Sequence, residues 1–495
     1  MKNIGIKGTS ADAVFLTFIK LVTTVLGLAI TRLLSQHLEV HNYGTYSQIM
    51  LLVSTVSSIT MFGMMDGVNY FGAGEQDAAK RESYLATIFA LQCTLSTVAG
   101  CIIMVLQKPI CLYFDNADVS KYLIFAAVLP FLQNLLGMSQ VLFVSIGKAR
   151  LLAYRNLVVS LFRLIAVLIV TWVVKSAAVV LIASLILDIG QITFFWSILH
   201  KNHCRIKFSM IQPRLLGNIF HYCAPMAIYL IVNTLNRDMD KYLISMMTDT
   251  ETLALYANAS KQLPFDIIMA SFCTVLVPYI TRYISEQNRE KAAELYKLFL
   301  EITYISTGIL CCAALSSAPQ LMKLLYSNKY TDGLAIFCVY ILVDLFRFTN
   351  ITLVLSAGGK TKWLMFMGFG ALGLNAVLNS ILYSVMGIIG PAIATLVVTV
   401  IMGILMLNLS AGVLKMRLSA FFDFPYLLKL TVESIVLVFA LSILRQYLEK
   451  MDVHYFLILI IVAGIYGVSM LFINGRRLLA DMKKVNHIAK HTDEI

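Results

Sequence analysis

The chain has 495 residues, of which 59% are hydrophobic and 13% charged, and its formal net charge is +12. Soluble domains carry about 25% charged residues, so this composition excludes an ordinary soluble protein and predicts an all-α polytopic membrane protein. The basic residues lie in short loops between apolar runs, which does not favour binding to nucleic acid. The nine cysteines show no Cys-x-x-Cys spacing, which argues against a disulfide framework and a zinc site.

About fourteen apolar stretches are long enough to cross a bilayer. Their approximate limits are 12–34, 43–71, 84–106, 121–146, 151–174, 177–199, 216–246, 252–280, 298–317, 331–356, 362–385, 387–413, 426–447 and 454–473. The start of the chain is basic, but no small-residue cleavage site follows it, so we expect an uncleaved first span. The connecting loops reach roughly 20 residues at most, and we expect no soluble domain on either side.

The distribution of lysine and arginine predicts the orientation. With the N-terminus inside, the cytoplasmic loops and tails hold about 25 basic residues, the outer loops about 7 and the spans about 7. We therefore expect both termini to be cytoplasmic.

The two halves of the chain repeat each other. Matching residues recur at offsets of 210, 212 and 211: Tyr46 with Tyr256, Lys148 with Lys360, and Ala183 with Ala394. Each half holds an even number of spans, which indicates a parallel repeat, as in transporters that rock two bundles about a central site. The predicted organisation is two six-helix lobes, 1–210 and 211–420, followed by two further helices and a cytoplasmic tail in 421–495.

The seventh apolar stretch contains a charged segment, which lies at the end of the part from Cys223 to Lys241. Arg237, Asp238, Asp240 and Lys241 follow an apolar run, and Tyr242–Met247 is apolar again. Charge within a hydrophobic span costs several kcal/mol unless it is paired or faces water, so it marks a functional site. The alternative is a long helix whose charges reach the outer headgroups, and the sequence leaves both readings open.

Five basic residues within spans are candidates for binding an anionic substrate: Lys20, Arg32, Arg163, Arg237 and Lys261. Lys20 ranks first because it stands about 13 Å into its span, with its nearest acid two turns away. Arg163 has an equally plausible structural role, a packing salt bridge to Asp188. We expect Asp344 and Arg347, three residues apart on one helix face, to neutralise each other.

Three aspartates are candidates for coupling transport to a Na⁺ or H⁺ gradient, namely Asp238, Asp240 and Asp266. Asp266 and Lys261 flank Pro264, which removes a backbone hydrogen bond and frees carbonyls to bind a cation or to face water. A simple kink is the alternative. We find no nucleotide-binding loop, no Gly-x-Ser-x-Gly and no metal-spaced histidines, and therefore expect no enzyme, no metal and no cofactor.

Three loose motifs carry a family resemblance: Thr31–Gln36 with Tyr43–Tyr46, Ala224-Pro225 through Tyr256–Pro264, and Ser145–Lys148. With them the chain resembles the multidrug/oligosaccharidyl-lipid/polysaccharide flippase superfamily, in particular its polysaccharide-transporter branch of Wzx-type O-antigen and capsule-unit translocases. Fourteen spans fit that branch and the lipid II flippases better than the twelve-span drug exporters. The arginine-rich start of the lipid II flippases is matched here only by Lys20 and Arg32.

The resemblance implies a flippase in the bacterial inner membrane. It would move undecaprenyl-diphosphate-linked oligosaccharide to the outer leaflet for surface polysaccharide biosynthesis, beside a polysaccharide polymerase and a chain-length regulator. A cationic cavity would hold the head, and the last two spans would border the lipid tail. Two rivals are an ion-coupled multidrug or cation exporter of the same fold, with an acidic and aromatic cavity, and a membrane-embedded enzyme, which would need a large outer loop or a His/Asp site.

Overall fold

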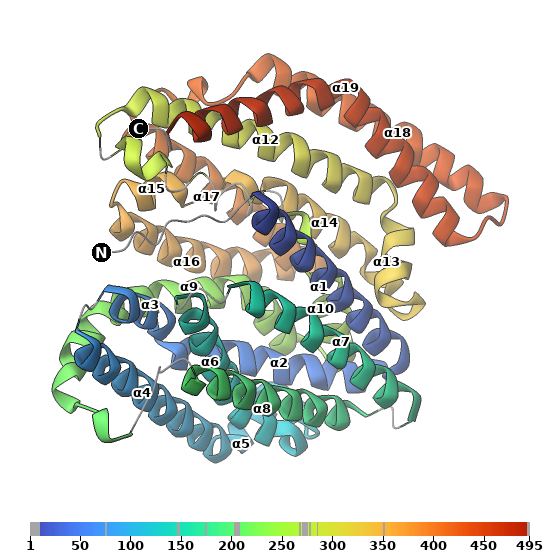
Figure 1. The fold of residues 1–495 in the computed structure, drawn as a ribbon. Helices are drawn as coiled ribbons and strands as arrows, with labels where there is room; N and C mark the ends of the chain where they lie inside the picture. Colours follow the sequence, from blue (N-terminus) through green and yellow to red (C-terminus); the bar gives the residue numbers. More distant parts are fainter. Residues whose placement is uncertain are drawn as a thin grey trace. The chain divides into compact units, whose positions relative to one another are not determined.

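A computed structural model describes residues 10–74, 77–145, 149–173, 176–201, 208–266, 269, 276, 279–284, 286–349 and 352–492. Every regular element within these residues is a helix, as Figure 1 shows. The predicted all-α polytopic class is therefore confirmed. Lys148 of the internal repeat lies outside the described residues, and so do residues 267–268, 270–275 and 277–278 of the predicted span 252–280.

Twelve stretches of the described chain are long and apolar enough to cross a membrane. One of them, Lys362–Leu414, contains two successive helices, α16 (Thr361–Met386) and α17 (Gly390–Leu414). Because part of the eighth predicted span is not described and that span is not among the twelve, the count of fourteen stays a prediction.

The chain divides into two compact units, Met1–Ala254 and Leu255–Ile495, and α10 (Thr250–Ala259) runs across the division. The lobe limits 1–210 and 211–420 rest on the sequence repeat and remain predictions. The long helices of the N-terminal unit are α1 (Ser10–His37), α2 (Val40–Met61), α3 (Met64–Gly74), α4 (Ala78–Val105), α5 (Gln107–Tyr113), α6 (Val119–Ser145), α7 (Ala149–Val173), α8 (Ala177–Lys201) and α9 (Leu216–Met247).

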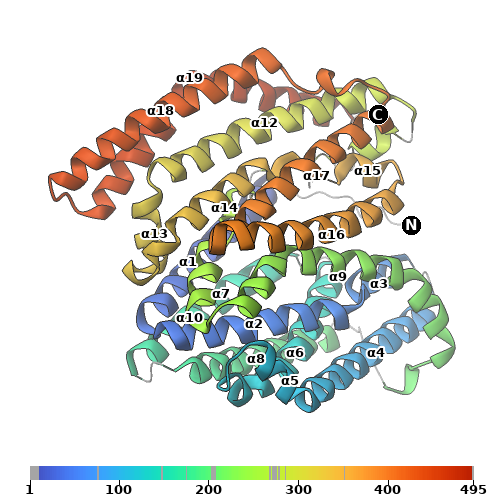
Figure 2. The ribbon, with the colours of Figure 1, turned by 180° about the vertical axis from the view of Figure 1, so that it is seen from behind.

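Helix α6 is the centre of the N-terminal unit, and α2, α3, α4 and α8 pack against it (Figure 2). Helix α1 packs along α7, and α9 lies against α2 and α3. The sequence fixes several of the helix limits. Asp77 caps α4 by accepting from the Ala79 N–H, and Phe62 and Gly63, both with positive φ, separate α2 from α3.

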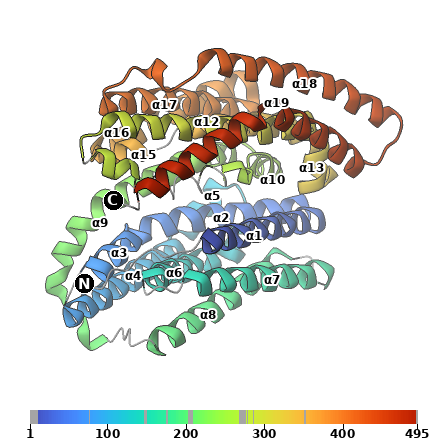
Figure 3. The same cartoon turned by 45° about the horizontal axis from the view of Figure 1, so that its top comes forward.

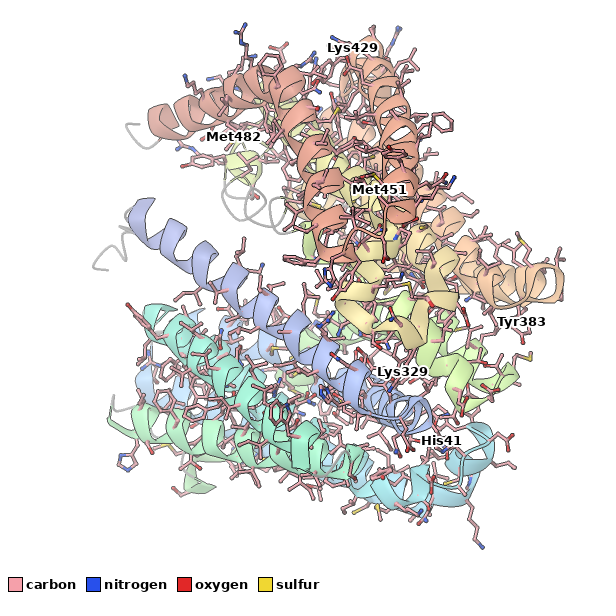
Figure 4. The ribbon with its side chains drawn as sticks, turned by 90° about the vertical axis from the view of Figure 1, so that its right-hand side faces the viewer. His41, Lys329, Tyr383, Lys429, Met451 and Met482 are labelled. Carbon is pink, nitrogen blue, oxygen red and sulfur yellow. The ribbon has the colours of Figure 1, made fainter. Side chains whose placement is uncertain are left out.

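The C-terminal unit is built on α12 (Arg289–Ser316), whose N-cap is Asn288. The 28-residue helix is buried along most of its length by α14 (Leu334–Phe346), α18 (Phe424–Lys450) and α19 (Tyr455–Thr492), as Figure 3 shows. Figure 4 marks Lys429 and Met451 on or beside α18, and Met482 on α19. The shorter helices are α13 (Ala318–Tyr326) and α15 (Leu353–Ala357).

The helix break predicted at Pro264 is present. Helix α10 ends at Ala259, and a single 3₁₀ turn follows over Pro264–Asp266. The freed N–H of Leu263 donates to the Asp344 carboxylate at 3.0 Å, and Arg347 lies 3.5 Å from the same carboxylate. The predicted pairing of Asp344 with Arg347 is thus confirmed, and Asp344 also satisfies one of the backbone groups that the break exposes.

Candidate functional site

The charged segment of α9 forms one connected cluster in the N-terminal unit. Asp238 is buried and receives Lys241 Nζ on one carboxylate oxygen at 2.8 Å and Arg237 Nη2 on the other at 3.0 Å. The side chain of Arg237 is 50% exposed, against 21% for Lys241. Two cations thus share one carboxylate, and the more exposed cation is Arg237.

Helix α2 supplies the polar groups that orient this cluster. Arg237 Nη2 donates to Ser54 Oγ at 2.9 Å, and Ser54 Oγ donates in turn to Asp238 at 3.4 Å. Beside it, the hydroxyls of Thr55 on α2 and Tyr242 on α9 share a short hydrogen bond. These bonds fix the guanidinium of Arg237 against the middle of α2, about 21 Å from the helix start at Val40. The position supports the reading that the charges lie within the span.

A cavity of about 330 Å³ opens beside Arg237. It is lined by side chains of α2, α3, α6 and α9: Met50, Val53, Ser54, Ser57, Ser58, Met61, Met65, Gln133, Asn134, Leu230, Thr234 and Arg237. More than half of these residues are polar, although all four helices belong to predicted membrane spans. The lining thus offers hydrogen-bonding groups beside apolar surface.

The wall of the cavity is held by a hydrogen-bonded set around Asn134, which is fully buried. Its Nδ2 donates to Thr60 Oγ1 at 2.8 Å and to the Ser57 carbonyl at 3.1 Å, and Ser57 Oγ donates to Asn134 Oδ1. Because these polar groups satisfy each other, the wall is rigid without a ligand. Arg237, Gln133 and Thr234 are the lining residues that can contact a ligand.

Arg237 and Lys241 both contact the Asp238 carboxylate, and half of the Arg237 side chain stays exposed. A guanidinium with exposed N–H groups binds phosphate oxygens in a forked, charge-assisted geometry. The cavity can therefore hold an anionic group at Arg237 and hydroxyl-rich groups along its wall.

A second ion pair joins α7 to α8. Arg163 Nη2 lies 3.5 Å from Asp188 Oδ1, and Gln191 Nε2 donates to the same oxygen at 3.0 Å. Gln191 in turn accepts from the buried Arg155, whose guanidinium lies 4.7 Å from the Phe195 ring centre. The structural alternative for Arg163, a salt bridge that packs two adjacent helices, is therefore present. Its side chain is still 42% exposed.

The other predicted basic residues lie apart from the Arg237 cluster. Lys20 is exposed on α1, and no ion pair joins it to an acid among the described side chains. Arg32, on the same helix, is half-buried. Lys261 is exposed in the C-terminal unit, in the interruption after α10. The structure thus brings together Arg237 and Asp238 of the predicted set, and their substrate-binding and coupling roles remain predictions.

The predicted coupling aspartates differ in surroundings. Asp238 has both oxygens engaged by cations, whereas Asp240 is buried and accepts from the Lys241 N–H at 2.8 Å. The side chain of Asp266 lies outside the described part. Among the described residues, no group of three or more His, Cys, Asp or Glu is suited to hold a metal ion.

Sequence reasoning missed the residues that complete the cavity, above all Ser54 and Asn134. A signal was present, because Ser54, Ser57 and Ser58 lie at helical spacing within an otherwise apolar span. Their partner Asn134 is 77 residues from Ser57, and nothing local connects the two.

A family profile described as "Polysaccharide biosynthesis protein" matches residues 29–335, more than half of the chain. No curated protein sequence matches the chain. The fold is similar to that of a lipid II flippase MurJ in an inward closed conformation, with TM-score 0.70 at 16% identity over 94% of this chain and 100% of that one.

Two further solved structures share the fold at lower similarity. One is an inward-facing multidrug resistance MATE family transporter of the MOP superfamily, with TM-score 0.61 at 13% identity over 81% of this chain and 99% of that one. The other is a MOP superfamily transporter from Pyrococcus furiosus, described as having a binding pocket of reverse polarity, with TM-score 0.56 at 13% identity over 83% and 95%. At these identities the likeness establishes the fold.

Proposed function

The chain belongs to the polysaccharide biosynthesis protein family, and from this premise we propose that it is a flippase for undecaprenyl-diphosphate-linked oligosaccharide. It moves the head group from the cytoplasmic to the outer leaflet of the bacterial inner membrane, with both termini in the cytoplasm. The product serves surface polysaccharide biosynthesis, where a polymerase and a chain-length regulator would act next. Translocation changes no covalent bond, so the chain acts as a transporter rather than an enzyme.

One observation carries this proposal: a half-exposed arginine, held in place by a buried carboxylate, faces a polar cavity between membrane-spanning helices. A diphosphate bears negative charge at every physiological pH, and its oxygens match the guanidinium fork. Gln133 and Thr234 of the cavity offer hydrogen bonds to sugar hydroxyls. A lipid-linked oligosaccharide combines these two chemistries in one head group.

The lipid tail needs an apolar surface instead. Helices α18 and α19 of the C-terminal unit expose many large apolar side chains, among them Phe439 at 68% and Phe472 at 87%. We assign to them the border along which the tail stays in the bilayer while the head crosses.

Transport proceeds by alternating access of the two predicted lobes, 1–210 and 211–420, as the parallel repeat favours. In this scheme Arg237 and Arg163 contact the diphosphate, with Lys20, Arg32 and Lys261 as further cationic contacts. Asp238, Asp240 and Asp266 would couple the return step to a Na⁺ or H⁺ gradient. Collapse of each gradient in turn, with transport as the readout, identifies the coupling ion or removes this part of the scheme.

The test is the location of lipid-linked units in a strain deleted for this gene. We expect diphosphate-linked units to accumulate on the cytoplasmic leaflet, and to be cleared by the wild type but not by Arg237→Ala at equal expression. Arg282→Ala is the matched control, because Arg282 is 43% exposed and pairs with Glu286 at the end of a helical segment.

Normal glycan export with altered tolerance of cationic drugs would replace the flippase with the exporter. If Arg237→Ala clears the accumulated units as well as the wild type does, the flippase function stands. Arg237 is then not its anion site.

A further inference from the structure

Two exposed tyrosines stack on each other where α3 meets α9 in the N-terminal unit. The rings of Tyr70 and Tyr222 are 4.2 Å apart between centroids and 19° from parallel. Tyr70 is 55% exposed and Tyr222 37%, so the pair has free ring surface. By the predicted orientation, the end of α3 and the start of α9 lie on the cytoplasmic side of the membrane.

Buried groups behind the pair hold it in place. Phe71 contacts the edge of Tyr222 at 5.6 Å and stacks on Tyr84 at 4.3 Å. Tyr84 is 5% exposed, and its hydroxyl accepts from Asn218 Nδ2 at 3.3 Å. The position of the exposed rings is therefore set before any ligand arrives, which lowers the entropy cost of binding.

Two glycines allow α3 to approach α9 closely enough for the rings to meet. A Cβ on Gly67 would lie 2.8 Å from Cys223 Sγ, and one on Gly63 would lie 2.7 Å from the Cys223 carbonyl oxygen. Gly63 also has φ +69°, a conformation that side chains other than glycine rarely adopt. The contact between the two helices thus depends on these two positions.

A carboxylate stands beside the rings. Asp66 is one helical turn before Tyr70 and therefore shares its face of α3. It is half-buried, and none of the ion pairs among the described residues involves it. A carboxylate without a cation at the edge of an aromatic surface is a strong acceptor for hydroxyl donors.

This surface matches the chemistry of a sugar ring, which has C–H groups on its faces and hydroxyls around its rim. We propose that Tyr70, Tyr222 and Asp66 form a carbohydrate platform that binds a pyranose ring of the lipid-linked oligosaccharide. The C–H face packs on the exposed tyrosine surface, and Asp66 accepts hydrogen bonds from neighbouring hydroxyls. The inference rests on the proposed function and identifies the residues that bind the glycan of the proposed substrate.

The platform continues into the cavity along α9. Tyr222, Met226, Leu230 and Thr234 follow at intervals of four residues, and the last two line the cavity with Arg237. On α3, Met65 lines the cavity directly before Asp66. From Tyr222 to Arg237 the helix rises about 22 Å, a length that several linked sugars span. The diphosphate at Arg237 and a sugar at Tyr222 therefore fit one extended head group.

The test measures binding of two lipids to the full-length protein in nanodiscs. One is the undecaprenyl-diphosphate-linked unit from the deletion strain, and the other is undecaprenyl diphosphate without sugar. We expect Tyr222→Ala to weaken the glycan-bearing lipid about tenfold, the scale of one aromatic contact, and to leave the sugar-free lipid unchanged. Asp66→Asn should show the same selectivity, and Tyr222→Phe should retain most of the affinity.

Tyr154→Ala is the matched control, because Tyr154 is 53% exposed near the predicted cytoplasmic end of α7. Equal losses for both lipids in Tyr222→Ala and Tyr154→Ala would mean that these tyrosines anchor helices at the membrane surface, which overturns the platform. Unchanged binding of both lipids in Tyr222→Ala would overturn it as well. Failure of the wild type to bind either lipid would instead contradict the proposed function.

Discussion

Each unit of the molecule contains an arginine cluster, and the two arginines differ in how many carboxylates they contact. In the N-terminal unit, Arg237 and Lys241 share the single carboxylate of Asp238. In the C-terminal unit, Arg477 alone pairs with two carboxylates, Glu301 and Asp423, and its guanidinium lies 3.7 Å from the Tyr426 ring centre. Arg237 thus shares the Asp238 carboxylate with a second cation, whereas Arg477 contacts two carboxylates by itself.

The difference separates a binding arrangement from a structural one. Arg477 joins α12, the residue before α18, and α19 through hydrogen bonds to two carboxylates. Arg237 is 50% exposed, and its neighbours orient it without enclosing it. The number of carboxylates that an arginine contacts, together with the exposure of its side chain, thus indicates whether it can bind a ligand. The presence of an ion pair alone does not.

The largest expected effect is on stability, from Arg477→Ala. The change leaves Glu301, 7% exposed, without its cation, and unpairing a buried charge costs about 3–5 kcal/mol. Chemical unfolding of the purified protein measures this loss. Arg476→Ala, at the exposed neighbouring position, should cost far less. Equal losses for the two variants would contradict the structural role of Arg477.

Arg237→Ala should weaken ligand binding strongly and lower stability little. Charge-assisted hydrogen bonds are worth about 1.5–3 kcal/mol, so affinity for undecaprenyl diphosphate should fall about 10- to 100-fold. Stability should change by less than about 1 kcal/mol, because Asp238 keeps Lys241 and the removed side chain is half-exposed. Binding and unfolding measured on the same preparation test both statements. A large stability loss with intact affinity would mean that Arg237, like Arg477, has a structural role and does not bind the ligand.

Ser54→Ala should have a smaller effect on ligand affinity than Arg237→Ala. It removes the hydroxyl that links Arg237 to Asp238, a hydrogen bond worth about 0.5–1.5 kcal/mol. We expect a few-fold loss of diphosphate affinity, because Arg237 keeps its charge but loses part of its orientation. Ser47→Ala, on the same helix, is the control, since Ser47 bonds its own helix at the Tyr43 carbonyl. Equal effects of the two substitutions would refute the orienting role of Ser54.

The smallest effect concerns pH. The hydrogen bond from Arg477 holds the pKa of Asp423 below its usual range. A lowered folded-state pKa adds stability above the unfolded pKa of about 3.9, and this stability is lost as pH falls through the folded value. The difference in unfolding free energy between wild type and Asp423→Asn should therefore shrink on acidification from neutral pH to below pH ~4. A difference that does not vary over this range would contradict the pairing.

Local sequence patterns predicted several features that the structure contains. Composition predicted the helical membrane class, Pro264 predicted the interruption after α10, and three-residue spacing predicted the pairing of Asp344 with Arg347. The charged segment on α9 was also identified as the region of interest. Each of these features depends on residues close together in the chain.

The partners of that segment were beyond sequence reasoning because they come from distant helices. Ser54 is 183 residues from Arg237, and Tyr70 meets Tyr222 only because Gly63 and Gly67 let α3 approach α9. Lys20 was ranked first for lacking a nearby acid, a property that says nothing about which helix it faces. The depth and charge of a residue can be estimated from the sequence, and they identify candidate site residues. Which residues line the cavity depends on how α2 packs against α9.

The most direct test of the central claim is translocation in proteoliposomes that contain the purified protein and the undecaprenyl-diphosphate-linked unit. Arrival of glycan at the opposite leaflet is followed for wild type, Arg237→Ala, Arg237→Lys and Arg282→Ala. We predict transport by wild type and Arg282→Ala, partial transport by Arg237→Lys, which keeps the charge but not the fork, and little by Arg237→Ala. Undiminished transport by Arg237→Ala would contradict the account.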